Sequence, residues 1–424
     1  MPFWTTLARR SILCLGLVLP ATALTQDPSS LRRGINAYPW LYDARSVDNK
    51  GQSYFLDQTF PYAKEYTLKA LTTLKGMGLD FIRIHVEPNA FLTTDASQRG
   101  KLISQILDAV DLTNEARLTA IVTFTPNPAT PDWQATAILQ STVKKQLYED
   151  TLVELAEDVV KSKKNNVVLE LMNEPPGGWS RLDMNLWLPT QEEYLKAVRR
   201  VAPELPIVVS GDKSGTIDGL LRLDPAELKD GHLYFSFHYY DPMLVTHQGA
   251  ASPNYKYRVF LSGIPYPPVA SEEKSTLTRI HDNIFKGISD HKEADTVWDQ
   301  AETAIRQYFE TQQGEAKILA DFSRVTAWAR SNHIQASRIL LGEFGVYRPA
   351  ASKQTVINYL HDVRVAAEQD GFPWAVYNYS PNKPLPNFQL FLQPGPNPPN
   401  FDPEIVKQGL GLSMPTAIAA STIR

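Results

Sequence analysis

The length and composition of the chain indicate a large globular catalytic domain and exclude several other classes of protein. The chain has 424 residues, 43% hydrophobic and 21% charged, so it can bury a large core and is not disordered as a whole. Its 42 lysines and arginines against 46 aspartates and glutamates give a formal net charge of −4, which offers no basic excess to a phosphate backbone. We therefore expect no nucleic acid partner, and we expect a monomer.

The first 23 residues have the features of a signal peptide. Arg9 and Arg10 precede a short apolar stretch over Ser11–Leu19, and Ala21-Thr22-Ala23 offers the small-x-small pattern of a cleavage site. The apolar stretch is too short to span a bilayer of about 30 Å, so we expect no membrane span after cleavage. An uncleaved anchor and twin-arginine export are the alternatives. Cleavage would remove Cys14, the only cysteine, and we expect a secreted or periplasmic bacterial protein.

Short apolar runs alternate with amphipathic runs along residues 24–424. The apolar runs predict eight strands, at Gly34–Tyr38, Asp80–Val86, Leu118–Phe124, Val167–Met172, Pro206–Ser210, Leu233–Tyr239, Arg338–Phe344 and Pro373–Tyr379. The amphipathic runs predict helices at about Tyr66–Met77, Gly100–Ala116, Ser141–Lys161, Gln191–Val201 and Lys353–Glu368, with a closing helix at Asp402–Gly411. Eight such units predict an α/β fold, a single (β/α)8 TIM barrel. An open doubly wound sheet is the alternative, but no Gly-x-Gly-x-x-Gly follows the first strand.

One connection is much longer than the others. About 95 residues, roughly 242–337, separate the sixth predicted strand from the seventh, and they include two helical runs at Thr296–Gln313 and Ala316–Ser331. Long loops on the carboxyl side of barrel strands commonly shape access to the active site. We expect this insertion to form a lid or cleft wall; a helical pair packed on the barrel exterior is the alternative.

Two glutamates follow or end buried-type strands. The run Val167–Met172 stops at Asn173-Glu174-Pro175, and Glu343 lies within the apolar run Arg338–Phe344. Burial raises the pKa of a carboxyl group and suits it to proton donation, whereas a nearby arginine lowers the pKa and suits the group to nucleophilic attack. These two acids are therefore candidates for catalysis, although Glu343 alone is also compatible with a core salt bridge.

Other polar and aromatic residues lie on the predicted strands. Arg83 occupies an apolar strand, where a charge needs a carboxylate partner, and His238 and Tyr240 share a face because strand side chains alternate. Trp374 lies on the last strand. Each of these residues alone is compatible with a structural role, but together they indicate an active site at the carboxyl ends of the strands.

The order of these motifs resembles glycoside hydrolase family 5, which holds cellulases and related retaining β-glycanases on a (β/α)8 barrel. The resemblance is carried by Asn173-Glu174-Pro175, by Gly342-Glu343-Phe344-Gly345, and by Arg83, His238, Tyr240 and Trp374, and it runs from Arg33-Gly34-Ile35-Asn36 to Trp374. It implies that Glu174 is the acid/base and Glu343 the nucleophile.

The resemblance also implies the supporting roles. Asn173 would bind the sugar 2-hydroxyl, Arg83 and Tyr240 would hold the nucleophile, and His238 would flank the acid/base. Trp374 would form the floor beneath the cleaved sugar. The family often has a histidine at the end of the third strand, but this chain has Ile121–Pro126 there. His85, just after Arg83, is the candidate replacement.

The remaining candidates for substrate binding are aromatic, with Asn36 as a supporting residue. Trp40, Trp133 and Trp179 follow predicted strands, and at least one is expected to hold a neighbouring sugar, because the C–H faces of a pyranose pack on aromatic rings. Trp298 and Trp328 fall in the helical runs of the insertion and are expected to pack there.

The mechanism implied is double displacement on a β-linked polysaccharide or oligosaccharide, with the two carboxyl groups about 5–5.5 Å apart. We expect no metal and no cofactor, because the sequence has no His-Glu-x-x-His motif and no cysteine ligands beyond the leader. An exopolysaccharide-associated transglycosidase and a non-catalytic carbohydrate-binding protein on the same fold are the alternatives.

Overall fold

The structure is a computed structural model, and it describes residues 31–414 apart from 43–45, 48–52, 55–59, 61, 93–95, 129, 178–185, 229, 382–387 and 394–399. The predicted signal peptide and Cys14 lie outside the described residues. Within the described part of the chain, no helix is long and apolar enough to cross a membrane.

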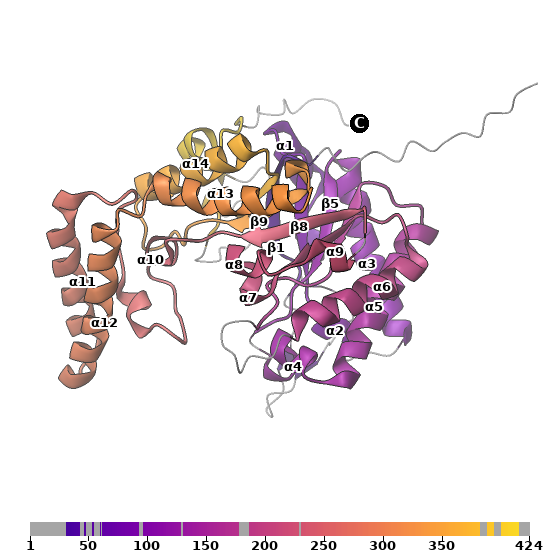
Figure 1. The fold of residues 1–424 in the computed structure, drawn as a ribbon, viewed down its shortest axis with the longest axis horizontal. Helices are drawn as coiled ribbons and strands as arrows, with labels where there is room; N and C mark the ends of the chain where they lie inside the picture. Colours follow the sequence, from indigo (N-terminus) through magenta and orange to yellow (C-terminus); the bar gives the residue numbers. More distant parts are fainter. Residues whose placement is uncertain are drawn as a thin grey trace, which may run out of the picture.

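The core of the fold is a closed barrel of eight parallel strands (Figure 1). The strands are β1 (Arg33–Leu41), β4 (Phe81–Val86), β5 (Thr119–Phe124), β6 (Val167–Glu170), β7 (Ile207–Ser210), β8 (Leu233–His238), β9 (Ile339–Phe344) and β10 (Trp374–Tyr379). The barrel closes because β1 pairs with both β10 and β4. The predicted TIM barrel is therefore confirmed, and the open sheet is excluded.

Four short strands lie outside the barrel in two small antiparallel pairs. They are β2 (Ser46–Val47) with β3 (Ser53–Tyr54), and β11 (Phe391–Gln393) with β12 (Asn400–Phe401).

The five predicted barrel helices are present. They correspond to α1 (Leu68–Gly76), α3 (Ala96–Glu115), α5 (Thr142–Lys161), α6 (Trp187–Val201) and α14 (Lys353–Asp370). Side-chain caps start several of them: Ser141 accepts a hydrogen bond from the Lys144 amide, and Ser352 accepts one from the Thr355 amide. The predicted closing helix at Asp402–Gly411 is shorter than expected and contains a π-helical turn, η7 (Ile405–Gly409).

Several short helices occupy the loops between the strands and the long helices. They are η2 (Ala63–Glu65), α2 (Asn89–Leu92), η3 (Pro131–Trp133), α4 (Ala135–Leu139), α7 (Asp212–Gly215), α8 (Ile217–Leu220) and α9 (Pro225–Leu228). Lys213 and Ser214 within α7 have left-handed backbone angles, so this element is a left-handed turn.

An apolar layer closes the amino-terminal end of the barrel interior, where the strands begin. It is made of buried side chains at or near the strand starts, namely Leu31, Phe81, Ile121, Val168, Val208, Tyr234, Leu340 and Ala375. A Cβ at Gly34 would lie 2.2 Å from the Phe81 ring, so the layer fits only with a glycine there. Because this layer fills the bottom of the barrel, polar side chains inside it gather at the carboxyl ends of the strands.

The connection between β8 and β9 contains most of the remaining helices. They are α10 (Met243–Thr246), η4 (Lys256–Phe260), η5 (Ala270–Glu272), α11 (Glu273–Gly287), α12 (His291–Glu310), α13 (Glu315–Ser331) and η6 (Ala336–Arg338). The two predicted helical runs correspond to α12 and α13, whereas α11 was not predicted.

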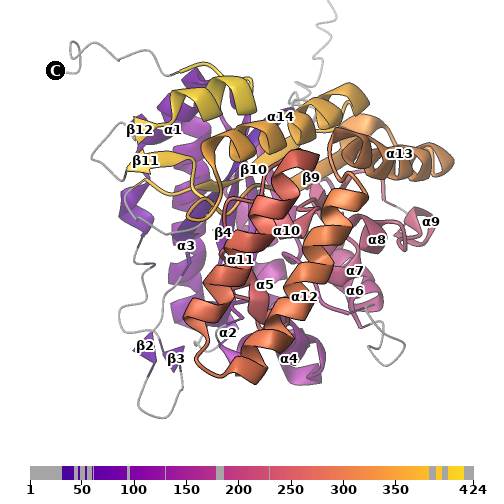
Figure 2. The same cartoon turned by 90° about the vertical axis from the view of Figure 1, so that its left-hand side faces the viewer.

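These helices take two different positions. Helix α13 covers the barrel: Phe322 meets Phe237 of β8 edge to face, and Trp328 meets Phe235. Trp328 therefore packs on the barrel, not within the connection as expected, whereas Trp298 contacts His281 of α11. Helices α11 and α12 form a hairpin that projects on the side to which the β8 arrow points (Figure 1) and stands in front of the barrel when viewed from there (Figure 2).

Candidate active site

A cleft of about 330 Å³ opens at the carboxyl ends of the strands. Its walls come from β1, β4, β6, β9 and β10 and from the loop after β5. They include Tyr38, Tyr42, His85, Thr125, Gln134, Asn173, Glu174, Glu343 and Tyr377. Four of the predicted site residues, His85, Asn173, Glu174 and Glu343, therefore line one cavity, although they are far apart in the sequence.

Arg83 is the centre of the hydrogen-bond network beneath the cleft. Its side chain is fully buried, and Nη1 donates to Glu343 Oε1 at 2.6 Å and to Asn36 Oδ1 at 2.8 Å. Nε and Nη2 donate to both oxygens of Glu170 at 2.6 and 2.8 Å, and Nη2 also donates to Asn173 Oδ1 at 2.7 Å. Burial alone would lower the pKa of Arg83, but Glu170 and Glu343 outweigh burial and raise it, so the guanidinium is a fixed positive charge.

Glu343 has a donor on each carboxylate oxygen. Arg83 donates to Oε1, and the Tyr240 hydroxyl donates to Oε2 at 3.0 Å. Burial and the negative charge of Glu343 raise the pKa of Tyr240 well above its ordinary value, so Tyr240 is a neutral phenol that can donate. Both contacts fix the orientation of the Glu343 carboxyl group.

Glu174 differs from Glu343 in its surroundings. Its side chain is 40% exposed, against 6% for Glu343, and its Oε1 lies 3.0 Å from His238 Nδ1. Glu174 has a φ of 45°, an uncommon value for a residue with a side chain. The following loop is fixed by hydrogen bonds from the Ser214 amide to Pro175 and from the Lys213 amide to Gly177. The carboxyl group of Glu174 therefore reaches the cleft from a strained turn that neighbouring backbone supports.

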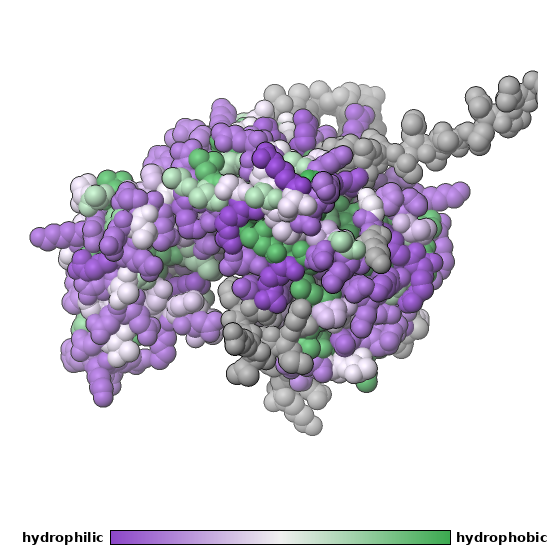
Figure 3. Space-filling model, viewed as in Figure 1, coloured by the Kyte–Doolittle hydropathy of each residue, from purple (hydrophilic) through white to green (hydrophobic). Residues whose placement is uncertain are grey.

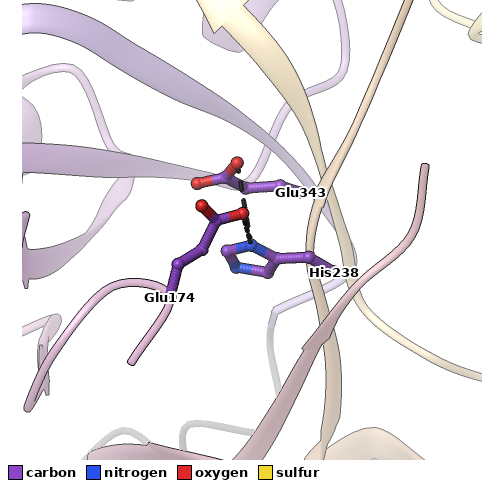
Figure 4. Close-up of side chains that lie close together, drawn as sticks. All are labelled: Glu174, His238 and Glu343. Atoms are coloured by element: carbon purple, nitrogen blue, oxygen red, sulfur yellow. Dashed lines mark hydrogen bonds and ion pairs between the residues drawn. The ribbon is translucent and has the colours of Figure 1, made fainter. Parts of the chain in front are cut away.

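His238 lies beside the carboxylates of both glutamates (Figure 4). Its Nδ1 is 3.0 Å from Glu174 Oε1 and 3.7 Å from Glu343 Oε2. Burial lowers the pKa of His238, but Glu343 and Glu174 outweigh burial, and the net pKa is raised. The ring also limits its neighbour on β9, because a Cβ at Gly342 would lie 3.0 Å from His238 Nε2 and 2.6 Å from Ser236 Oγ.

His85 also lines the cleft, with its Nε2 3.7 Å from Glu343 Oε1. Its Nδ1 lies 2.8 Å from Thr125 Oγ1, and its Nε2 lies 3.0 Å from Asn36 Oδ1. Burial, Arg83 and His238 lower the pKa of His85 well below its ordinary value, so this ring is neutral. His85 thus lies in the cleft wall beside the end of β5, where members of the resembled family often have a histidine. That His85 replaces this histidine stays a prediction. Asn36 is fully buried and supports Arg83 from behind.

Asn173 is oriented by Arg83. Because an arginine can only donate, the contact at 2.7 Å fixes Oδ1 toward Arg83. Among the described residues the Nδ2 of Asn173 has no acceptor, so it is left to donate into the cleft.

Glu174, His238 and Glu343 could in geometry surround a cation, since their nearest ligand atoms lie within 4.8 Å of one another. The chemistry of the donors disfavours this reading. The buried Arg83 charge lies 2.6 Å from Glu343, and both Glu343 oxygens already accept hydrogen bonds. The cluster is better explained as two carboxylates with different tasks and a histidine between them.

The prediction that Trp374 forms the floor of the cleft is wrong. Trp374 is the first residue of β10, so it lies at the lower end of the barrel, and it is 0% exposed. Its ring meets Phe344 edge to face, and its Nε1 donates to Glu368 of α14 at 3.3 Å. The cleft position on β10 belongs to Tyr377, three residues later.

The other three tryptophans have different outcomes. Trp40 is 1% exposed and stacks on Tyr66 with ring centroids 4.3 Å apart, so it belongs to the core and cannot hold a sugar. Trp133 is half-buried beneath the Lys144 ammonium and directly precedes residues that line the cleft, so its sugar-binding role stays a prediction. Trp179 lies outside the described residues.

Two important residues of this site were not predicted. Glu170 is a buried acid within β6, and its partner Arg83 is 87 residues away, so no local pattern indicates the pairing. Tyr377 could have been found, because it lies near the carboxyl end of the last strand. Tyr377, Tyr38 and Tyr42 place three rings along one side of the cleft, with Tyr38 4.8 Å from Tyr42 and 6.0 Å from Tyr377.

A TIM barrel with paired carboxylates and an aromatic wall at its carboxyl end defines a glycoside hydrolase. The family model of cellulase (glycosyl hydrolase family 5) matches residues 47–383. The chain belongs to this family.

Curated relatives are distant. Endoglucanase 3 of Fibrobacter succinogenes is 22% identical over 237 residues, which is 56% of this chain and 33% of the relative. Endoglucanase C of Acetivibrio thermocellus is 20% identical over 225 residues, 52% of this chain and 61% of the relative. The aligned region thus spans less than two thirds of either relative.

Solved structures share the fold. Cellulose synthase subunit Z (CcsZ) of Clostridioides difficile is 21% identical, with a TM-score of 0.58, 90% of this chain and 99% of that chain covered. Cel5A of Thermotoga maritima in complex with cellobiose is 16% identical, with a TM-score of 0.62 and the same coverages. A family 5 lichenase of Caldicellulosiruptor in complex with cellotetraose is 17% identical, with a TM-score of 0.59 over 96% of this chain and 98% of that chain.

Proposed function

We propose that the protein cleaves a β-linked glucan, or a closely related β-glycan, by double displacement with retention of the anomeric configuration. The observation that carries this proposal is the closeness of the two carboxylates, since the nearest oxygens of Glu174 and Glu343 lie within 4.8 Å of each other. Retaining enzymes hold their carboxyl groups about 5–5.5 Å apart, whereas inverting enzymes leave about 6.5–9.5 Å for a water molecule.

Glu343 is the nucleophile in this proposal. Arg83 and Tyr240 hold it in one orientation, and its carboxylate attacks the anomeric carbon as the glycosidic bond breaks. The product of this step is a covalent glycosyl-enzyme. Asn173 Nδ2 is placed to donate to the sugar hydroxyl beside the anomeric carbon, and Tyr377 takes the place of the predicted tryptophan floor.

Glu174 is the acid/base. Its exposed carboxyl group protonates the departing oxygen, and it later removes a proton from the water that releases the sugar. The imidazole of His238, 3.0 Å from Glu174 Oε1, positions this carboxyl group.

The first test measures stereochemistry. Proton NMR during early hydrolysis of cellotetraose by the wild-type enzyme is expected to show the β-anomer of the new reducing end first. Initial formation of the α-anomer would overturn retention.

The second test separates the two glutamates. Glu343→Ala is expected to abolish turnover of every substrate. Glu174→Ala is expected to lower kcat on glucan by about 10²–10⁴-fold, but to spare the first step of a dinitrophenyl β-cellobioside, whose leaving group needs little protonation. Azide should accelerate Glu174→Ala and yield a β-glycosyl azide. Equal losses on both substrates would count against Glu174 as the acid.

We further propose that residues 1–23 are a cleaved signal peptide and that the catalytic domain, residues 24–424, acts in the periplasm or medium. The pattern of Arg9 and Arg10, an apolar run and Ala21-Thr22-Ala23 supports this. Mass spectrometry of the exported protein is expected to give an N-terminus at Leu24.

A second candidate function is the trimming or transfer of glucan chains during their synthesis. The likeness to a cellulose synthase subunit over 99% of that chain favours testing it. A transglycosidase would form oligosaccharides longer than the cellotetraose supplied, whereas a hydrolase would form only shorter ones.

A further inference from the structure

We propose that the enzyme has a second glycan-binding site outside the cleft, at the junction between the α11–α12 hairpin and the loop after β9. This inference rests on the proposed function, because its ligand is the part of a long β-glucan chain that extends beyond the cleft. A cavity of about 330 Å³ lies at the small end of the range for ligand sites, so a polymer must continue past it.

The site is a separate cavity of about 500 Å³. Its walls come from four parts of the chain: Gly249 after α10, Val259–Ser262 at the end of η4, Asn283 and Lys286 on α11, and Tyr347 with Pro349 after β9. The space-filling view shows that the surface of the projecting hairpin is mostly hydrophilic (Figure 3).

A row of aromatic rings connects this junction cavity to the cleft. Tyr377 lines the cleft, and its ring lies 5.7 Å from that of Phe388. The Phe388 ring lies 5.8 Å from that of Tyr347, which lines the junction cavity. All three residues are partly exposed. They therefore offer successive apolar surfaces on which sugar units can pack between one cavity and the other.

The lining of the junction cavity suits a neutral sugar. Tyr347 and Phe260 supply ring surface for the C–H faces of a pyranose, and Asn283 and Lys286 supply polar groups for its hydroxyls. Asn283 Nδ2 donates to the Phe260 carbonyl at 2.9 Å. Within the described part of the chain its Oδ1 has no donor, so it can accept a hydrogen bond from a ligand.

The walls of the cavity are held in place before a ligand arrives. The Gly263 amide donates to the Ala350 carbonyl at 2.8 Å, and the Tyr347 amide donates to the Thr246 carbonyl at 2.7 Å. Arg279 of α11 donates to the carbonyls of Ser262 and Gly263, both at 2.9 Å. A preformed site loses little conformational entropy on binding.

The test measures affinity against chain length. In the full-length Glu174→Gln protein, Kd is determined by calorimetry for cello-oligosaccharides of two to eight units. We expect the affinity to keep rising beyond the length that fills the cleft. Adding Tyr347→Ala is expected to remove at least a fivefold gain of affinity for the longest chains, and Lys286→Ala a smaller part of it. Tyr347→Phe keeps the ring and is expected to retain the gain.

Lys292→Ala is the matched control, because Lys292 is exposed on α12 and lines neither cavity. Thermal melting of each variant checks folding. An unchanged length dependence in Tyr347→Ala, or an equal loss for short and long chains, would overturn the second site. If the wild-type enzyme hydrolyses glucan while Tyr347→Ala binds long chains normally, only this inference fails. If the wild-type enzyme neither binds nor hydrolyses any β-glucan, the proposed function fails with it.

Discussion

Glu170 shows how a residue outside the cleft can control the nucleophile. It holds two nitrogens of Arg83, while a third nitrogen of Arg83 holds Glu343. One guanidinium charge is therefore shared between two buried carboxylates. Without Glu170 the whole charge would act on Glu343, and the carboxylate would become a weaker nucleophile.

Glu170→Gln is expected to lower kcat on aryl cellobiosides, because an unshared Arg83 charge attracts the nucleophilic carboxylate more strongly. It is also expected to destabilise the fold by about 3–5 kcal/mol, since it breaks a buried ion pair. Steady-state kinetics from pH 4 to 8 and urea unfolding measure both effects. Glu302→Gln, which loses a partly exposed pair with Arg306 on α12, is the control and should cost about 1 kcal/mol at most. An unchanged kcat of the folded Glu170→Gln variant would mean that Glu170 is only structural.

Trp374 and Tyr377 lie on the same strand but have different environments, because Trp374 packs in the core and Tyr377 lines the cleft. Trp374→Ala is expected to destabilise the fold by about 3–5 kcal/mol, because it removes a fully buried ring, while KM of the folded enzyme changes little. Tyr377→Ala removes a ring from the cleft and is expected to lower kcat on glucan with a smaller loss of stability. Thermal unfolding and steady-state kinetics on both variants test this. The reverse pattern would restore the original assignment of Trp374.

The strands and helices of the barrel were predictable because each strand is a short apolar run that lies between amphipathic runs. The carboxyl ends of the strands meet at one end of the barrel, so Glu174, Glu343, Arg83 and His238 could be predicted to lie close together. The last strand was different, because the run from Pro373 to Tyr377 is apolar or aromatic throughout. Its pattern therefore does not indicate whether Trp374 or Tyr377 lines the cleft. Helix α11 was missed because the pattern of its buried residues, Thr276, Ile280 and Ile284, is sparse. The pairing of Glu170 with Arg83 depends on strand order, which local patterns do not contain.

Strand β9 places one glycine where a side chain would disturb catalysis. Gly342→Ala puts a Cβ 2.6 Å from Ser236 Oγ and 3.0 Å from His238 Nε2, so the Ser236 hydroxyl must shift and the His238 ring must give by a few tenths of an ångström. We expect kcat to fall by less than about 10²-fold, the loss that a displacement of about 1 Å can cause, with both glutamates intact. Gly100→Ala is the matched control, because nothing lies within 4 Å of its Cβ and alanine favours helix α3. Full activity of Gly342→Ala would show that the position of His238 is unimportant.

At the scale of the whole molecule, His85 and His238 make stability depend on pH in opposite directions. Each lies within the site, yet the surroundings of His85 lower its pKa and those of His238 raise it. The pKa of His85 is lowered, by burial first and then by Arg83 and His238. The pKa of His238 is raised, because Glu343 and Glu174 outweigh burial.

The two signs follow from proton linkage. Below the ordinary histidine pKa of 6.5, His85 is protonated in the unfolded chain but stays neutral in the folded chain. His85 therefore lowers the free energy of unfolding as the pH falls. His238 binds its proton more tightly in the folded chain, so its stabilising contribution is complete below pH 6.5 and is lost as the pH rises through its raised pKa. The difference in free energy of unfolding between the wild type and His238→Gln is therefore expected to decrease from pH 5.5 to 8.5. The same difference between the wild type and His85→Gln is expected to increase over this range. Urea unfolding of the three proteins at several pH values measures both slopes, and because each variant differs from the wild type at one histidine, each serves as the control for the other. Parallel slopes for the two variants would contradict a raised pKa of His238 beside the two glutamates.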